Sequence, residues 1–150
     1  MKAIMVAGIL GLVLASCGSR EPLEIKQFTV RNIEDDWSQD LLVSGEVKKR
    51  LYGAVEQAER EKRKGQYYSA RWRAAPSGGP VKVRFQYRQA ASGSRVQELV
   101  HTVPATEGTG VVEFAIAGDS YLKGGRVLAW RTILSQGGVE LGVKKSFLWD

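Results

Sequence analysis

Apolar and polar residues alternate along most of the chain beyond residue 65. In the clearest run, VKVRFQYRQ at residues 81–89, Val81, Val83, Phe85 and Tyr87 are separated by polar or cationic residues. Alternation with a period of two predicts a strand that buries one face and exposes the other. Clusters of Gly, Pro and Ser separate further runs of this kind. We predict these further strands at residues 66–74, 96–103, 111–118, 126–134 and 139–149.

Two features refine the arrangement of the last strands. Residues 126–134 are apolar at both alternating sets of positions, which is typical of a central strand covered on both sides. The sequence SQGG at residues 135–138 predicts a hairpin, because glycine readily adopts the positive φ that two-residue turns require. We therefore expect the last two strands to pair with each other.

The pattern before residue 66 is different. An alternating run at residues 23–33 predicts a first strand, and the next apolar residues recur at helical spacing. We predict one amphipathic helix at about residues 44–64, with Ser44 as its N-cap and Gly65 just beyond its C-terminus. Its narrow apolar stripe favours packing on the protein's own core over insertion into lipid. Three pairs on this helix have the favourable four-residue spacing: Glu46–Arg50, Glu56–Arg60 and Glu59–Arg63.

The order of these elements predicts a mainly β fold, an antiparallel two-sheet sandwich with one helix inserted after the first strand. In its short strands and turns the second half resembles an immunoglobulin-like or fibronectin-type-III-like sandwich. The resemblance is architectural, because the cysteine pair of true immunoglobulin domains is absent and Tyr121 lacks the spacing of a tyrosine corner. We predict a single domain at residues 23–150, with Trp72 and Trp130 in its core.

The first residues have the layout of an export signal. Lys2 precedes a continuous apolar run from Ala3 to Leu14, which small residues follow. The run is too short to cross a membrane as a helix, which requires about 20 residues. The motif Leu14-Ala15-Ser16-Cys17 resembles the lipobox of bacterial lipoproteins, in which the cysteine is acylated and the segment before it is removed.

The lipoprotein resemblance implies a signal peptide at residues 1–16 and a short tether at residues 17–22. Cys17 would then carry acyl chains that anchor the protein to a membrane, and several chains on one residue give durable attachment. Residue 18 is glycine, whereas an aspartate there favours inner-membrane retention in lipoproteins of enteric-type bacteria. The resemblance therefore implies the cell envelope, on the periplasmic side of the outer membrane if the cell has two membranes. An ordinary cleaved signal with a chance cysteine is the alternative.

The charge balance bears on the partners. The chain has 22 Lys and Arg residues against 16 Asp and Glu residues, a formal net charge of +6. This excess favours anionic partners such as phospholipid headgroups or acidic wall polymers. An exported, membrane-tethered domain does not routinely meet nucleic acid, so we expect no nucleic-acid partner.

The chain offers few groups for catalysis or metal binding. Its one histidine, His101, lies in a predicted strand without the context of a nucleophile and base, and lipid consumes the single cysteine in the lipoprotein interpretation. The ligand mixtures of zinc sites cannot be assembled from such a set. We therefore predict that the protein is not an enzyme and needs no cofactor or metal. Glu98, Glu113 and Asp119 could supply the paired carboxylates of a glycosidase, but any protein with acidic residues offers such pairs. The loop with Asp35, Asp36 and Asp40 lacks the glycine and the regular ligand spacing of an EF-hand calcium site.

One surface feature carries a functional hypothesis. If the strands at residues 66–74 and 81–89 pair across the turn APSGGP, their outward cations share one sheet face. Neighbouring like charges favour an anionic partner, and the alternative is a solvated face neutralised by Glu98, Glu113 or Glu140. The candidate anion-binding residues are Arg71, Arg73, Lys82, Arg84 and Arg88.

These features predict a lipid-anchored envelope protein that binds or scaffolds. The first hypothesis is an assembly or accessory protein that docks a protein partner through a sheet edge or the outer face of the helix. The alternative is a module that binds anionic glycans or lipids through the basic sheet face. High salt separates the two, because screening weakens binding by exposed charges more than binding by shape.

Overall fold

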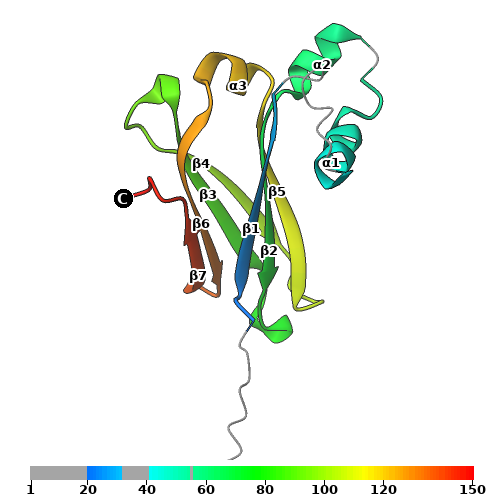
Figure 1. Ribbon diagram of the computed structural model, residues 1–150. Coiled ribbons are helices and arrows are strands. Elements are labelled where there is room, and N and C mark those ends of the chain that lie inside the picture. Colours follow the sequence, from blue (N-terminus) through cyan, green and yellow to red (C-terminus); the bar gives the residue numbers. More distant parts are fainter. Residues whose placement is uncertain (1–19, 32–40, 55) are drawn as a thin grey trace, which may run out of the picture.

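The computed structural model describes residues 20–31, 41–54 and 56–150. Cys17 and the acidic loop with Asp35, Asp36 and Asp40 therefore lie outside the described residues. Within these ranges the chain forms strands, three helices and two short 3-10 turns (Figure 1). The strands are β1 (Leu23–Val30), β2 (Gly65–Arg73), β3 (Val81–Gln89), β4 (Gln97–Val103), β5 (Thr109–Ala117), β6 (Val127–Gln136) and β7 (Val139–Lys145). The helices are α1 (Leu41–Leu51), α2 (Gln57–Arg63) and α3 (Asp119–Gly124), and the 3-10 turns are η1 (Pro76–Gly78) and η2 (Ala90–Ser92).

The strands form two antiparallel sheets packed face to face, which confirms the predicted sandwich (Figure 1). The three-stranded sheet has the order β1-β2-β5, and the four-stranded sheet has the order β4-β3-β6-β7. This order is immunoglobulin-like, because β5 returns to pair with β2 after the β3–β4 connection while β6 pairs with β3. The predicted β6–β7 hairpin is confirmed, with Gly137 and Gly138 both at positive φ.

The core lies between the sheets and consists of the inward set of each alternating strand. Along β3 the predicted inward residues Val81, Val83, Phe85 and Tyr87 are all buried. Phe85 is central, with ring centroids 4.5 Å from Tyr68 of β2 and 5.1 Å from Phe114 of β5. Full burial of each such side chain contributes about 1.5–3 kcal/mol to the free energy of unfolding, so these contacts hold the two sheets together.

The two tryptophans predicted for the core differ in burial. Trp72 is buried as expected. Trp130 is only partly buried at the margin of the core, where its ring lies 5.7 Å from that of Tyr68. Its indole N–H donates a hydrogen bond to the side-chain oxygen of Gln27 at 3.3 Å. This bond holds the polar edge of the Trp130 ring at the surface, so the side chain is only partly buried.

The single predicted helix at residues 44–64 is wrong, because this region forms the two short helices α1 and α2. Gly53 interrupts the helical backbone with φ of +81°, a conformation that other residues avoid. Glu56 then starts α2 with a capping box completed by Glu59. Gly65 is not a helix cap either but the first residue of β2. A Cβ at this position would overlap the backbone of β5, so this glycine permits the close approach of the two strands.

The predicted pairing of β2 with β3 is also wrong, because the two strands belong to different sheets. The connection between them is a crossover that contains the turn η1 rather than a hairpin. The side-chain amide of Gln136 in β6 donates hydrogen bonds of 2.8 Å to the carbonyl oxygens of Ala75 and Gly79. These two bonds fix the crossover against the four-stranded sheet.

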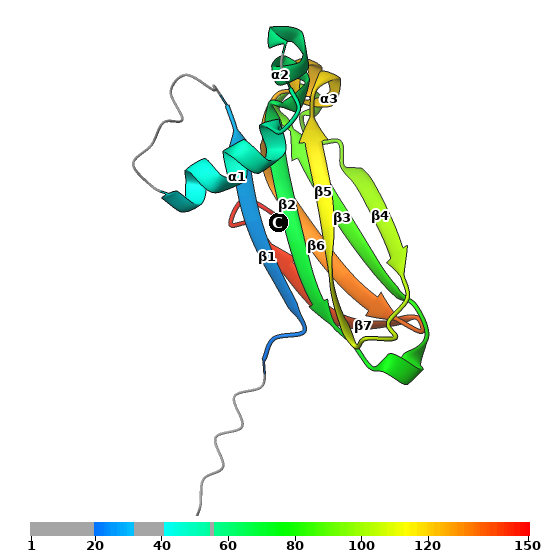
Figure 2. The same cartoon turned by 90° about the vertical axis from the view of Figure 1, so that its right-hand side faces the viewer.

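The two ends of the sandwich carry different elements (Figures 1 and 2). The chain enters β1 at the end that also carries the β2–β3 crossover and the β6–β7 hairpin. Helices α2 and α3 lie at the opposite end, and α1 crosses the outer face of the three-stranded sheet (Figure 2). In the described part of the chain, none of the helices has the length and apolar character needed to span a bilayer.

Candidate functional site

The outer face of the four-stranded sheet gathers cations from three neighbouring strands. Gln86 of β3 is the pairing partner of Arg131 in β6, and Arg131 is the partner of Lys145 in β7. Residues at paired positions point to the same side of a sheet, so the alternate residues of β3 share this side with Arg131 and Lys145. We call these five cations the basic face: Lys82, Arg84, Arg88, Arg131 and Lys145.

The basic face has few counterions. Glu98 of β4 and Glu140 of β7 lie on the same side by register. Glu98 accepts a hydrogen bond of 2.7 Å from Gln86, not from a cation. Among the described residues, no ion pair joins any of the five cations to a side-chain carboxylate. Their positive charges are therefore left to solvent or to a ligand.

Arg131 and Arg88 are held in place by nearby groups, and Arg88 donates a hydrogen bond of 3.2 Å to the backbone oxygen of Asp150. The oxygen of the Gln86 side chain accepts two hydrogen bonds from the Arg131 guanidinium, at 3.0 and 2.6 Å. Both guanidiniums also lie over the ring of Trp149, with distances to the ring centroid of 4.7 Å for Arg88 and 5.2 Å for Arg131. Trp149 is only 5% exposed. These contacts orient both arginines, and the partners of Arg131 are all uncharged.

Two of the predicted anion-binding residues, Arg71 and Arg73, do not belong to the basic face. They lie on β2 in the other sheet, on the opposite side of the molecule. Arg71 lies 4.0 Å from the carboxylate of Glu24, and Arg73 donates a hydrogen bond to the carbonyl oxygen of Glu21. The predicted single face is therefore wrong for this pair, whereas Lys82, Arg84 and Arg88 do share one face.

The outer face of the three-stranded sheet is organised around Arg50 of α1. Its guanidinium donates two hydrogen bonds of 2.7 Å to the carboxylate of Glu113 in β5. It also lies 4.1 Å from the ring centroid of Tyr67 in β2 and 5.7 Å from that of Phe28 in β1. The hydrogen bonds from Arg50 hold the pKa of Glu113 below its usual value, and those to Glu113 raise the pKa of Arg50. This pair therefore joins the helices to the sheet rather than offering free charge.

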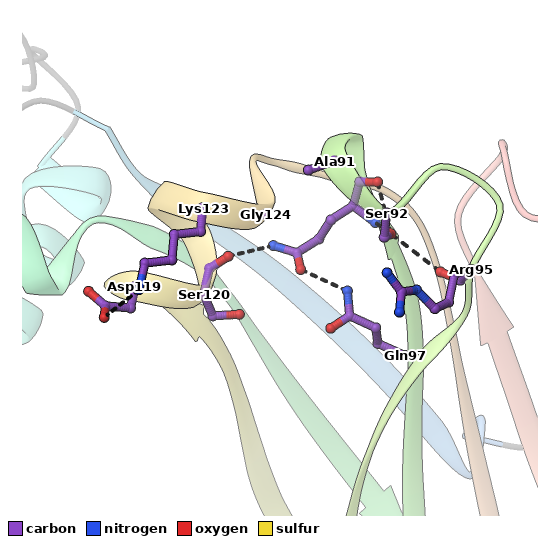
Figure 3. A pocket seen from close by; sticks show the side chains of 9 residues that line it. Ala91, Ser92, Arg95, Gln97, Asp119, Ser120, Lys123 and Gly124 are labelled. Carbon is purple, nitrogen blue, oxygen red and sulfur yellow. Dashed lines mark hydrogen bonds and ion pairs between the residues drawn. The ribbon is translucent and has the colours of Figure 1, made fainter.

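A polar pocket of about 460 Å³ opens at the end of the sandwich opposite the chain entry, between α3, η2 and the start of β4 (Figure 3). Gln89 lies at its base and is buried. Its amide nitrogen donates to the carbonyl oxygens of Ser120 and Gly125, and its oxygen accepts from Gln97. Asp119 and Lys123 at the rim form an ion pair at 3.3 Å. The pocket lining includes no histidine or cysteine, and its buried polar groups already have partners.

The remaining candidate catalytic residues are dispersed. His101 is exposed on β4, with its ring 5.1 Å from that of Phe114. Glu98, Glu113 and Asp119 each have a different partner and lie on different elements. In the residues that the structure describes, no three His, Cys, Asp or Glu side chains are grouped so that they could hold a metal ion.

Sequence reasoning missed Arg131 and Lys145 because it placed the wrong neighbour beside β3. The sequence does contain a signal for the correct one, since residues 126–134 have the two-sided apolar pattern of a central strand. A central strand has a pairing partner on each side. The predicted hairpin supplies one partner for residues 126–134, and β3 is the long strand that could supply the other.

Comparisons with protein families, with curated proteins and with solved structures find no match to this chain.

Proposed function

We propose that this protein is a lipid-anchored, non-enzymatic binding module of the cell envelope, and that its basic face binds an anionic envelope component. The observation that carries the proposal is the set of five cations on one sheet face with no carboxylate ion pair among the described residues. The groups that this face would bind are phosphates or carboxylates displayed on a surface or polymer, because exposed cations attract such groups without a shaped pocket.

The arrangement of charge supports this function over docking through the helices. The helices already use their central cation, Arg50, to attach to Glu113. By contrast, the side chains of Lys82, Arg84 and Lys145 on the basic face make neither an ion pair nor a hydrogen bond within the described chain. Residues that contribute no internal contact are available for a ligand.

A protein partner is the second candidate, and the outer edge of β5 favours it. β5 pairs with β2 on one side only, and no described strand occupies its other edge. It contains no proline, and its pairing with β2 shows no bulge. Such an edge can accept an extended segment of another protein. Binding at this edge would persist at high salt, whereas binding at the basic face would weaken.

The test of the basic face is a binding titration of the full chain, purified in detergent, with inorganic polyphosphate of defined length. A triple variant, Lys82→Gln, Arg84→Gln and Lys145→Gln, removes three charges without breaking a described contact. Each cation near an anionic surface contributes about 1 kcal/mol, so the affinity should fall roughly a hundredfold at low salt. Binding by the unaltered chain should itself weaken as salt rises.

The matched control removes three cations from elsewhere: Lys26→Gln, Lys62→Gln and Arg71→Gln. It has the same net charge as the first variant but keeps the basic face. We expect it to bind polyphosphate within about threefold of the unaltered chain, since distant exposed charges are largely screened. Equal losses in the two triple variants would show that net charge, and not this face, is responsible.

The lipid anchor is tested separately with Cys17→Ser in cells. The unaltered protein should enter the detergent phase in a phase-partition experiment, because acyl chains are the attachment that the lipobox resemblance implies. The variant should stay unprocessed or appear as a soluble exported form. A variant that is processed and partitions like the unaltered protein would contradict the lipoprotein assignment.

A further inference from the structure

A second feature lies next to the basic face, in the segment that follows β7. Phe147 is 98% exposed and Leu148 is 63% exposed, whereas the next residue, Trp149, is buried against the sheet. Two consecutive large apolar side chains in water are costly to display. Neither contributes to the described core, so their exposure needs another explanation.

The backbone of this segment is fixed in a way that keeps both side chains outward. The amide of Ser146 donates to the carbonyl oxygen of Trp130 at 2.9 Å, and the amide of Trp130 donates to the Ser146 hydroxyl at 2.9 Å. The amide of Trp149 then closes a turn onto the carbonyl oxygen of Ser146 at 3.1 Å. Phe147 and Leu148 form the tip of this turn.

Several cations lie near the exposed pair, although Lys144 is ion-paired with Glu21 and Asp150 follows two residues after Leu148. Lys144 and Lys145 precede it with only Ser146 between, and Arg88 and Arg131 lie over the ring of Trp149, which follows it. Two valines on the same sheet face, Val100 and Val143, are also 46% and 39% exposed. Apolar side chains beside lysines and arginines are the combination that binds the interface of an anionic bilayer, where the apolar groups enter the acyl boundary and the cations meet the headgroups.

The point where the chain enters the domain supports the same occupant. Glu21 forms an ion pair with Lys144 of β7. Pro22 lies so close to β7 that a Cβ at Gly142 would be 3.0 Å from it. Three residues separate Cys17 from Glu21, so the four Cα–Cα steps between them can span at most about 14 Å. An acylated Cys17 would therefore keep β7, the edge strand of the basic face, next to the bilayer.

We propose that the occupant of the basic face is the anionic bilayer surface itself, and that Phe147 and Leu148 insert between its headgroups. The proposal rests on the proposed function and names its partner. In this arrangement the sandwich lies on its four-stranded sheet, and the three-stranded sheet with α1 faces away from the membrane. A soluble acidic protein would be attracted to the cations, but its attraction to them would not explain why Phe147 and Leu148 are exposed.

The test places a photo-crosslinking side chain at the tip of the turn in the full chain, as Phe147→benzoylphenylalanine. The protein is reconstituted into vesicles of phosphatidylethanolamine and phosphatidylglycerol and irradiated. Position 147 is almost fully exposed, so the larger side chain fits without disturbing the core. The matched control is Val111→benzoylphenylalanine, on the outer face of β5 and 59% exposed.

We expect at least fivefold more lipid adduct at position 147 than at position 111. The yield at position 147 should fall when phosphatidylcholine replaces phosphatidylglycerol, because the cations then lose their partner. Equal yields at the two positions would overturn the proposal. The same irradiation in cells should also give lipid adducts at position 147, and an adduct there with a protein but no lipid would overturn the proposal as well.

A second variant distinguishes failure of this inference from failure of the proposed function. The double change Phe147→Ser and Leu148→Ser should leave polyphosphate binding unchanged and should reduce crosslinking from a benzoylphenylalanine at Val143 at least threefold. If polyphosphate binds but no lipid adduct forms, the membrane proposal fails while anion binding stands. If lipid adducts form without any polyphosphate binding, anion binding by the basic face fails instead.

Discussion

At the scale of residues, the cations of this protein fall into two groups with different surroundings. Arg50 is internal to the fold, since its side chain is only 11% exposed and its guanidinium pairs with the carboxylate of Glu113. Lys82, Arg84 and Lys145 have no such partner in the described chain. The same residue type therefore stabilises the fold in one place and is available for binding in another. The distinction lies in the contacts and not in the charge.

The Arg50–Glu113 pair predicts a particular dependence of stability on pH. Hydrogen bonds from Arg50 lower the pKa of Glu113 in the folded protein. The ionised pair therefore stabilises the fold above the unfolded pKa of a glutamate, about 4.3, and this contribution is lost as the pH falls through the folded pKa. Glu113→Gln should lower the free energy of unfolding by up to about 1 kcal/mol at pH 7, since the carboxylate is partly exposed.

The measurement is denaturant unfolding of both proteins between pH 3 and pH 7. The difference between them should be constant at neutral pH and should shrink below about pH 4.3. Glu107→Gln, in an exposed loop, is the control and should track the unaltered protein throughout. A difference between Glu113→Gln and the unaltered protein that persists down to pH 3 would show that the carboxylate charge contributes nothing.

At the scale of elements, the sequence predicted where the strands lie better than it predicted which strands pair with each other. The period-two pattern located β3 and the inward set of its side chains, because burial of one sheet face is a local property of the sequence. Which strand lies beside β3 depends on the crossover at residues 74–80, and its deciding contacts come from Gln136, about sixty residues away. No local pattern reports such a contact.

The helical region was mispredicted for a different reason. Apolar spacing on the two sides of Gly53 is compatible with one continuous helix, and a glycine within a helix is tolerated at a modest cost. The structure uses the positive φ of Gly53 to turn the chain. The basic face was recovered in part, since Lys82, Arg84 and Arg88 follow from the pattern of one strand, whereas Arg131 and Lys145 require the strand order.

Two glycines in this region should respond to alanine in opposite directions. Neither Gly45 nor Gly53 has an atom within 4 Å of an added Cβ, so neither change creates a clash. Gly53→Ala forces alanine to positive φ and should lower the free energy of unfolding by about 1–2 kcal/mol. Gly45→Ala lies within α1 and should raise it by about 0.5–1 kcal/mol. Thermal or denaturant unfolding measures both, and a stabilising Gly53→Ala would contradict the role of Gly53 as the break between α1 and α2.

At the scale of the whole molecule, the chain entry, the basic face and the exposed turn meet at one strand, β7. Its residue Lys144 pairs with Glu21 of the entering chain, Lys145 belongs to the basic face, and the turn with Phe147 follows directly. A short tether from a lipidated Cys17 would therefore present this side of the sandwich to the membrane. The polar pocket at the opposite end would be left free (Figure 3).

A residue-resolved footprint would show whether the outer face of the four-stranded sheet is the anion-binding surface. Amide chemical shifts of the full chain in detergent would be followed by NMR while inorganic polyphosphate is added. We expect shifts concentrated in β3, β6, β7 and the segment at residues 146–149, and these shifts should disappear at high salt. Shifts concentrated in β1, β2 and β5, or in α1, would contradict it.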